Sequence, residues 1–286
     1  MNLRVIYKTI SGSHLYGTAR PDSDMDIRGV CLPPMTALLG LSPFEQHEVP
    51  GEDTVIYDLR KFCRLALNAN PNCLELLWVP DDAILEIDNY GRQLLANRHL
   101  FLSTKVVYTY SGYAFAQLKR IEGHRRWLLN SPIEPTLGQF GGVLFAGQAK
   151  FPNQQKQQDY KAALRNWNDY QKWRRERNPA RAKVESEFGL DLKHASHLVR
   201  LLCQGRTILT EPDKFCPRLA GNDLETVLAV LHGEWEYEKL VEWARQQEIE
   251  LKVLADTVSP LPKKPRFNDV EKMVMEMLRE YVETQP

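Results

Sequence analysis

The first ninety residues alternate short runs of β-branched and aromatic residues with polar turn residues, a pattern typical of β-strands. Three such runs predict strands, at residues 3–10, 24–32 and 54–57. Pro33 and Pro34 end the second run, because proline cannot donate a hydrogen bond to a neighbouring strand. This part of the chain therefore predicts a small sheet.

Beyond about residue 90 the apolar residues recur every three or four positions, which is the period of an amphipathic helix. Helices are expected there at residues 92–102, 106–130, 154–177, 192–203, 224–231, 235–254 and 268–282, and two earlier ones at residues 59–68 and 70–78. The stretch 131–153 is rich in glycine and proline and predicts a long loop, which in proteins is usually functional or mobile. Together these patterns predict an α+β fold, with a small mixed-sheet domain at 1–98 and a mainly helical domain at 99–286.

Composition limits the classes of protein to which the chain can belong. Its 286 residues are 43% hydrophobic, which is enough to bury a core, and 37 basic residues balance 37 acidic ones. Any nucleic-acid surface must therefore be local. The five cysteines have no metal-binding spacing, and neither a signal peptide nor an apolar run of membrane-spanning length is seen. We therefore expect a cytoplasmic protein with no membrane partner.

One stretch carries candidate chemistry. Gly12 and Ser13 form a small turn, and about ten residues later Asp24 and Asp26 follow with one apolar residue between them. Alternate side chains of a strand share a face, and two carboxylates so close repel each other unless a divalent cation lies between them. A Gly-Ser turn offers a close backbone approach and a hydroxyl to a triphosphate. A solvated hairpin with an Asp-rich turn is the alternative.

The sequence of this stretch resembles the signature of the DNA polymerase β nucleotidyltransferase superfamily. It reads Gly-Ser-His-Leu-Tyr-Gly-Thr-Ala-Arg-Pro-Asp-Ser-Asp-Met-Asp-Ile-Arg-Gly-Val. Within that superfamily, the chain is similar to the RNA-repair-pathway (RlaP-type) nucleotidyltransferases. Residues 58–77 and the spacing of Lys193, His197 and Arg200 resemble two further blocks of that family. The resemblance implies a polymerase-β-like fold. It also implies that a nucleoside monophosphate passes from an NTP to an acceptor hydroxyl, at a tRNA-like RNA end.

Nucleotidyl transfer of this kind uses two Mg²⁺ ions, with Mn²⁺ as an alternative, held by three carboxylates. Asp24 and Asp26 are expected to bind both ions. The third carboxylate should come from a neighbouring strand, and Asp53 and Asp58 flank one short strand. The family block favours Asp53. Independently of the family, Asp58 is placed to cap the helix that follows it.

Other residues are candidates for binding the nucleotide. Gly12 and Ser13 are expected to hold a phosphate through an amide or the hydroxyl. Ser23 either contacts a phosphate or caps its loop.

Lys193, His197 and Arg200 fall within about 60° of one another on a helical wheel, opposite an apolar face. They predict an exposed basic stripe, and a plain solvated face is the alternative. The resemblance to the family block implies that the stripe binds the triphosphate, with lysine as a point charge and arginine as a bidentate fork.

Residues 167–183 interleave tryptophans with basic residues. This pattern is shared by surfaces that bind single-stranded nucleic acid and by solvated helices whose tryptophans face the core.

Two other functions remain open from the sequence. The acceptor hydroxyl could belong to a protein or a small molecule, or the chain could be a catalytically inactive RNA-binding protein.

Overall fold

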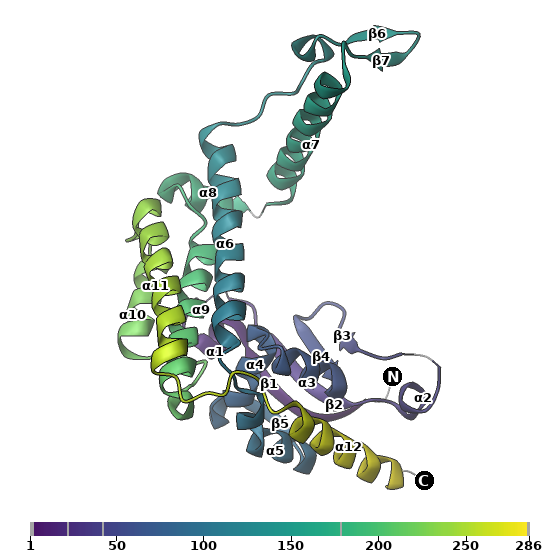
Figure 1. Cartoon of the computed structure of the whole chain (residues 1–286), viewed down its shortest axis with the longest axis vertical. Helices are drawn as coiled ribbons and strands as arrows, with labels where there is room; N and C mark the ends of the chain where they lie inside the picture. The colour runs from purple at the N-terminus through teal and green to yellow at the C-terminus, as the bar shows by residue number, and fades with distance from the viewer. Residues whose placement is uncertain (1–2, 22, 42, 178, 285–286) are drawn as a thin grey trace. The chain divides into compact units, whose positions relative to one another are not determined.

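The computed structural model covers nearly the whole chain (Figure 1). It describes residues 3–21, 23–41, 43–177 and 179–284. The chain forms two compact units, one made of residues 1–116 with 196–286 and the other of residues 117–195. This division differs in kind from the expected catalytic and helical domains, whose boundary at residues 98 and 99 stays a prediction.

The first unit is built on a five-stranded sheet with the strand order β3-β4-β2-β1-β5. The strands are β1 (Arg4–Ser11), β2 (Asp26–Leu32), β3 (Gln46–Glu48), β4 (Thr54–Asp58) and β5 (Ile84–Ile87). The sheet is mixed, because β2 runs parallel to β4 and antiparallel to β1. In this register the last residue of β1 and the first residues of β2 and β4 meet at one end of the sheet.

Strands β1, β2 and β4 confirm the three predicted strands, and the sheet followed by many helices confirms the α+β prediction. The short edge strands β3 and β5 are not among the predictions. β3 pairs with β4, but its three residues are all polar, so it carries no alternation of polar and apolar residues. The start of the second predicted strand is wrong, because β2 begins at Asp26 and Asp24 precedes it.

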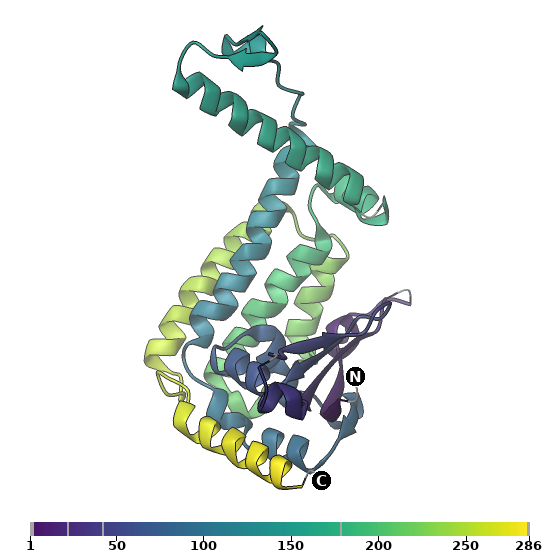
Figure 2. The same ribbon diagram turned by 90° about the vertical axis from the view of Figure 1, so that its right-hand side faces the viewer.

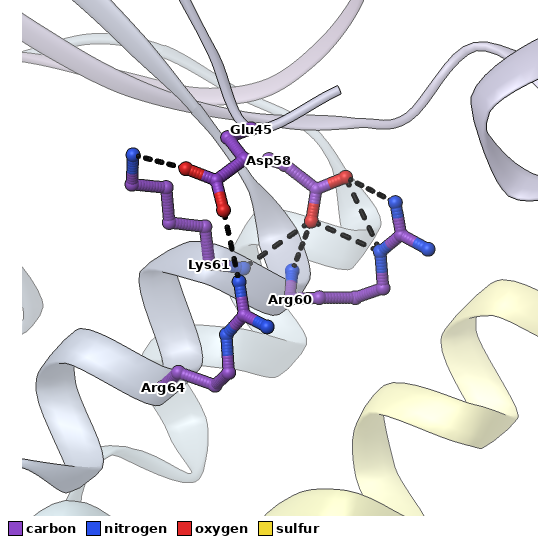
Figure 3. A network of polar contacts seen from close by, with 5 residues as sticks. All are labelled: Glu45, Asp58, Arg60, Lys61 and Arg64. Carbon is purple, nitrogen blue, oxygen red and sulfur yellow. Dashed lines mark hydrogen bonds and ion pairs between the residues drawn. The ribbon is translucent and has the colours of Figure 1, made fainter. Parts of the chain in front are cut away.

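Helix α3 (Leu59–Leu67) shows how local sequence places a helix on this sheet. Asp58 ends β4 and caps α3 by accepting hydrogen bonds from the amides of Arg60 at 2.7 Å and Lys61 at 3.2 Å. The Arg60 guanidinium also pairs with the Asp58 carboxylate at 2.9 Å. Glu45 holds the Lys61 ammonium at 2.9 Å (Figure 3). The capping role that the sequence suggests for Asp58 is confirmed, and the apolar side of α3 packs on β2 and β4.

The first unit contains further α-helices, most of which pack on the sheet or form a bundle. They are α1 (Gly12–Tyr16), α2 (Met35–Leu38), α4 (Pro71–Leu74), α5 (Asn89–Ala96), α10 (Gly221–Leu231), α11 (Tyr237–Thr257) and α12 (Phe267–Glu283), with parts of α6 (Val106–Leu129) and α9 (Leu192–Thr210). The short 3₁₀-helices are η1 (Glu75–Trp78), η2 (Asp81–Ala83), η3 (Arg98–Phe101) and η5 (Pro212–Lys214). Helix α5 packs on β1 and β5, and α12 packs on α3.

In Figure 2, α9, α10 and α11 run side by side with the first part of α6. Gly205 of α9 permits a close approach, because a Cβ there would lie 3.3 Å from the Cβ of Tyr110 and 3.7 Å from Leu251. The predicted helices 70–78 and 92–102 are each found as a short α-helix followed by a 3₁₀-helix.

The second unit contains the rest of α6, a β-hairpin, two further helices and the start of α9. Its remaining elements are η4 (Leu137–Phe140), β6 (Val143–Phe145), β7 (Gln148–Lys150), α7 (Gln154–Glu176) and α8 (Pro179–Phe188). The hairpin lies inside residues 131–153, so the prediction of a loop is wrong for the two strands of the hairpin. Its turn residues Ala146 and Gly147 have φ angles of 50° and 76°, the left-handed pair that a two-residue hairpin turn requires. Strands of three residues are too short to show an alternating pattern.

Two further observations concern the chain as a whole. All five cysteines carry free thiols. In the described ranges, no helix combines the length and the apolar composition that crossing a bilayer requires.

The cap of α3 can be tested by separating its hydrogen bonds from its ion pair. Asp58→Ala should lower the free energy of unfolding by about 1–2 kcal/mol, because it leaves two helix amides without acceptors. Asp58→Asn should cost less, since asparagine caps helices about as well as aspartate. Urea denaturation checks both, with Arg60→Ala as the control that removes only the ion pair. Equal losses for the alanine and asparagine variants would contradict the capping role.

Candidate active site

Two of the predicted carboxylates meet where β2 and β4 begin. Asp26 is the first residue of β2, and Asp53 directly precedes β4. The two strands pair in parallel with Ile27 opposite Thr54, and the Ile27 amide donates to the Asp53 carbonyl at 2.9 Å. The parallel register therefore makes Asp26 and Asp53 neighbours across adjacent strands, although they are distant in sequence.

A single cationic side chain lies between these two carboxylates. One terminal nitrogen of Arg28 is 3.4 Å from an Asp26 oxygen and 3.0 Å from an Asp53 oxygen. Its other terminal nitrogen donates to the backbone carbonyls of Asp53 at 2.7 Å and Ile27 at 2.8 Å. Asp26 and Arg28 are two residues apart on β2 and therefore share a face. The carboxylates of Asp26 and Asp53 thus converge on one position that already attracts positive charge.

The backbone of Gly12 lies directly against the Asp26 carboxylate. Gly12 has a φ of +64°, and a Cβ built on it would lie 1.9 Å from an Asp26 oxygen. Both the left-handed conformation and the contact exclude a side chain at this position. Ser11, the last residue of β1, pairs with Asp26, and this pairing places the next residue, Gly12, beside Asp26. Helix α1 begins at Gly12. Ser13 follows in the first turn of α1 and is half-buried.

Asp24 is exposed and lies just before β2. It lines an open pocket of about 480 Å³ together with Asp53. The other lining residues are Met25 and Ile27 at the start of β2, and Gly51, Glu52 and Thr54 around the start of β4. The sequence argument that strand alternation aligns Asp24 with Asp26 does not hold, because Asp24 is outside the strand. The structure nevertheless brings all three predicted carboxylates to the same end of the sheet, with Asp53 as the residue shared by the pocket and the Arg28 contact.

Asp58 lies at the other end of β4, where it pairs in register with Cys31 of β2. It is 1% exposed, and its carboxylate is occupied by the cap of α3. The geometry therefore separates the two candidates that the sequence left open, since Asp53 and not Asp58 is the neighbour of Asp26.

Ser23 closes the loop that leads to Asp24. Its hydroxyl accepts a hydrogen bond from the Arg20 amide at 2.8 Å, and its own amide donates to the Arg20 carbonyl at 3.0 Å. The His14 ring contacts the Ser23 carbonyl at 3.1 Å. The structure thus shows the loop-capping role of Ser23, while its contact with a phosphate stays a prediction.

The prediction of an exposed basic stripe on α9 is wrong for Arg200, which is buried. Arg200 is 3% exposed, and its guanidinium pairs with Glu75 at 2.9 Å and donates to Gln204 at 2.7 Å. Periodicity located Arg200 correctly relative to Lys193 and His197, but the buried countercharge Glu75 lies on η1 and is invisible to a helical wheel. Lys193 is exposed and belongs to the second unit, whereas the half-buried His197 belongs to the first.

Glu75 joins Arg200 to the signature helix α1. Its second oxygen accepts a hydrogen bond from the Tyr16 hydroxyl at 2.6 Å, and the Arg200 guanidinium lies 3.8 Å from the centre of the Tyr16 ring. Burial raises the pKa of the Tyr16 phenol far above its usual range, so Tyr16 remains a neutral donor. The Tyr16 carbonyl also accepts from the Leu219 amide at 3.2 Å. Tyr16, Glu75 and Arg200 therefore connect α1 to η1 and α9.

Sequence reasoning missed Glu75 as part of this arrangement. The signal available was a glutamate inside an otherwise apolar run, from Cys73 to Trp78. A charged residue in such a run is rarely left buried without a partner. The sequence does not say which distant residue supplies that partner.

The second unit holds another group of possible metal ligands. His124, Glu185 and Asp191 each offer a ligand atom, and these atoms lie within 4.8 Å of one another. Glu185 already pairs with Arg177 at 2.7 Å, and Asp191 accepts a hydrogen bond from the His194 amide at 3.0 Å at the start of α9. Because the cluster contains its own cation and a helix cap, its geometry is that of a polar core.

The tryptophan-rich stretch 167–183 packs partly inward. The Trp173 ring lies 5.4 Å from the Trp127 ring, and the Arg177 guanidinium is 4.2 Å from the Trp173 centroid. Arg174 and Arg175 are exposed. Nucleic-acid binding by this stretch stays a prediction, and Trp173 has at least one ring face occupied within the second unit.

Comparisons with known proteins agree with the motif. The sequence model of the RNA repair pathway DNA polymerase beta family matches residues 1–258. The uncharacterized 38.9 kDa protein in the nrdC-mobD intergenic region of Enterobacteria phage T4 is 27% identical over 139 residues, which are 43% of this chain and 41% of that protein. The chain thus matches less than half the length of this relative.

Among solved structures, the nucleotidyltransferase-like protein from Exiguobacterium sibiricum 255-15 is 12% identical. The similarity covers 97% of this chain and 74% of that one, with a TM-score of 0.26.

The buried pair can be tested by a double-mutant cycle. Arg200→Met should lower the free energy of unfolding by about 3–5 kcal/mol, because it leaves the Glu75 carboxylate buried without its countercharge. Adding Glu75→Leu should restore much of that loss, since both charges are then replaced by apolar groups. Urea denaturation of the two single variants and the double variant measures the coupling. A solvent-facing Arg200 would instead give a nearly neutral single variant and no coupling.

Proposed function

This chain belongs to the RNA repair pathway DNA polymerase beta family, and on that premise we propose that it is a metal-dependent nucleotidyltransferase. It would transfer a nucleoside monophosphate from an NTP to an acceptor hydroxyl at an RNA end, with a tRNA-like molecule as the acceptor. The observation that carries the proposal is the convergence of Asp26 and Asp53 on one cation-attracting position, against the bare backbone of Gly12.

The carboxylates at this end of the sheet suit a hard divalent cation. Oxygen ligands from carboxylates are those that Mg²⁺ prefers, and Arg28 demonstrates that Asp26 and Asp53 can share one positive group. We assign Asp24, Asp26 and Asp53 as the residues that would hold two Mg²⁺ ions, or Mn²⁺. When bound, such ions stabilise the attacking and leaving oxygens of an in-line displacement.

The chain's own residues contribute positioning and hydrogen bonds. Gly12 lets the backbone approach the carboxylates, and Ser13 offers its hydroxyl and amide to phosphate oxygens. In the transfer, the acceptor oxygen forms a bond to the α-phosphorus and the bond to pyrophosphate breaks. The hydroxyl proton passes to a carboxylate of the site or to water. Arg28 holds the beginnings of β2 and β4 together through its two backbone hydrogen bonds.

The predicted nucleotide contacts divide into two kinds. Ser23, Lys193 and His197 remain candidates for contacting the triphosphate. Arg200 is buried beneath Tyr16, so we assign it to the support of α1, where Gly12 and the half-buried Ser13 lie.

The proposal that RNA is the acceptor is based on the family. A direct test must separate it from two alternatives, namely another acceptor and a catalytically inactive RNA-binding protein. Purified protein is incubated with each labelled NTP and Mg²⁺, with and without tRNA. Label transferred to tRNA supports the proposal. Label found on protein or on a small molecule identifies another acceptor, and no transfer with RNA binding retained identifies a catalytically inactive RNA-binding protein.

Replacing the carboxylates singly tests the assignment of the site. Asp24→Asn, Asp26→Asn and Asp53→Asn should each lower the rate of transfer by roughly 10²–10³, because each removes an anionic oxygen ligand of the metal ions that would stabilise the negative charge developing on the leaving pyrophosphate. Asp58→Asn is the matched control and should keep the activity, because Asp58 lies at the other end of β4.

A second readout avoids dependence on turnover. Mn²⁺ binding, followed by electron paramagnetic resonance, should weaken in Asp26→Asn and Asp53→Asn and stay unchanged in Asp58→Asn. Wild-type rates in all three active-site variants, or loss of both activity and Mn²⁺ binding only in Asp58→Asn, would overturn the assignment.

A further inference from the structure

An open pocket of about 890 Å³ lies on the first unit, where four segments of the chain meet. It is lined by the end of α3, the residues around the start of α6, the last turns of α11, and the connector that leads into α12. Figure 1 shows this connector passing from α11 to α12. We call this the basic pocket, and it shares no lining residue with the pocket at Asp24 and Asp53.

The connector is a fixed wall of the basic pocket. Its Pro262 carbonyl accepts a hydrogen bond from the Thr104 amide at 2.9 Å, just before α6. Four residues later, the Arg266 amide donates to the Leu100 carbonyl at 2.9 Å. The lysines between these two anchors are therefore held beside the start of α6.

The lining of the basic pocket is strongly positive although the whole chain has no net charge. Its basic residues are Arg64, Lys105, Lys252, Lys263 and Lys264. Asp256 is the acidic residue among them, and it pairs with Lys263 at 2.9 Å.

Acidic neighbours offset part of the remaining charge. Glu248 pairs with Lys252 at 2.8 Å, and Glu45 lies 3.6 Å from Arg64.

Among the described residues, two of the positive charges in the basic pocket have no acidic partner. The Lys105 ammonium donates to the amide oxygen of Asn68 at 2.6 Å, which leaves its charge uncompensated. Lys264 is exposed, and within the described part of the chain it has no ion pair. An anionic ligand would supply the negative countercharge that these two lysines lack.

The basic pocket also presents two aromatic rings to solvent. Tyr108 is 75% exposed and Phe267 is 53% exposed, and both line the pocket. Large exposed aromatic rings next to cations are the combination that holds single-stranded nucleic acid, since bases stack on the rings while phosphates contact the cations. In the stretch 167–183, by contrast, Trp173 is in contact with Trp127 and Arg177.

We propose that the basic pocket binds a single-stranded segment of nucleic acid, and that this segment is the RNA acceptor of the proposed transfer. Tyr108 and Phe267 would stack on bases, and Lys105 and Lys264 would contact phosphates. Single strands fit this chemistry better than duplexes, whose stacked bases expose no faces to the rings. The identity of the acceptor rests on the proposed function, whereas the binding of a single strand does not.

Binding is measured by the fluorescence anisotropy of a labelled, unstructured oligoribonucleotide over a series of salt concentrations, without NTP. Lys105→Ala with Lys264→Ala should weaken binding and flatten the dependence of log K on log salt by about 0.7 per lost phosphate contact. Tyr108→Leu with Phe267→Leu should weaken binding roughly fivefold to a hundredfold for each lost stack and leave the salt slope unchanged. Leucine keeps apolar area and removes only the ring.

Two control pairs carry the same charge change elsewhere. Lys272→Ala with Arg279→Ala alters exposed cations of α12 that do not line the basic pocket, and it should bind RNA as the wild type does. Arg174→Ala with Arg175→Ala tests the competing surface on α7. Thermal melting of every variant confirms that the fold is retained.

The outcomes separate this inference from the proposed function. Loss of RNA binding in the pocket variants supports the inference even in a protein that shows no transfer. The inference is overturned by wild-type affinity in both pocket variants, or by weakened binding only in the α7 variant. The inference would also be overturned if ATP displaced the oligonucleotide completely at concentrations similar to those at which the oligonucleotide itself binds. That result would make the basic pocket a mononucleotide site.

Discussion

The buried carboxylate of Glu75 is the constraint on which the arrangement of the first unit depends. A carboxylate that is 1% exposed is stable only when opposite charge and hydrogen-bond donors surround it. Arg200 of α9 and Tyr16 of α1 satisfy this requirement, and they lie 125 and 59 residues away from Glu75 in sequence. Because removing either partner would leave buried charge or polar atoms uncompensated, α1, η1 and α9 can pack in few other ways. Replacing both members of such a pair by apolar groups is often neutral for stability, whereas removing one member is strongly destabilising.

The position of α1 in turn shapes the candidate active site. Gly12 begins α1 directly against Asp26, and the parallel register of β2 and β4 sets Asp53 beside Asp26. Repulsion between carboxylates is tolerable there because Arg28 lies between them, and the same convergence suits the divalent ions that we propose. Acidic charge is thus gathered at one end of the sheet. Basic charge gathers in a separate pocket formed by α3, α6 and the connector before α12, so a chain with no net charge has two locally charged surfaces.

Much of the site was predictable because its signals are local. The Gly12-Ser13 turn, the spacing to Asp24 and Asp26, and the cap formed by Asp58 each depend on residues close in sequence. The error at Arg200 originates in a contact between residues that are distant in sequence. The sequence predicts Arg200 on an exposed stripe, but Arg200 is buried, where it pairs with Glu75. Lys263 and Lys264 are neighbours in a proline-rich connector, and only the fold brings Lys105 and Tyr108 into the same pocket with them.

The sequence by itself therefore determined the family, the α+β class, the three central strands and most of the helices, since these follow from motifs and from periods of two and 3.6 residues. Only the tertiary structure decided that Asp53 is the neighbour of Asp26, that Arg200 is internal, and that a basic pocket exists. Strand register, buried countercharges and the meeting of remote segments arise from packing between elements. Periodicity along one element describes which face a residue lies on, but not which other element covers that face.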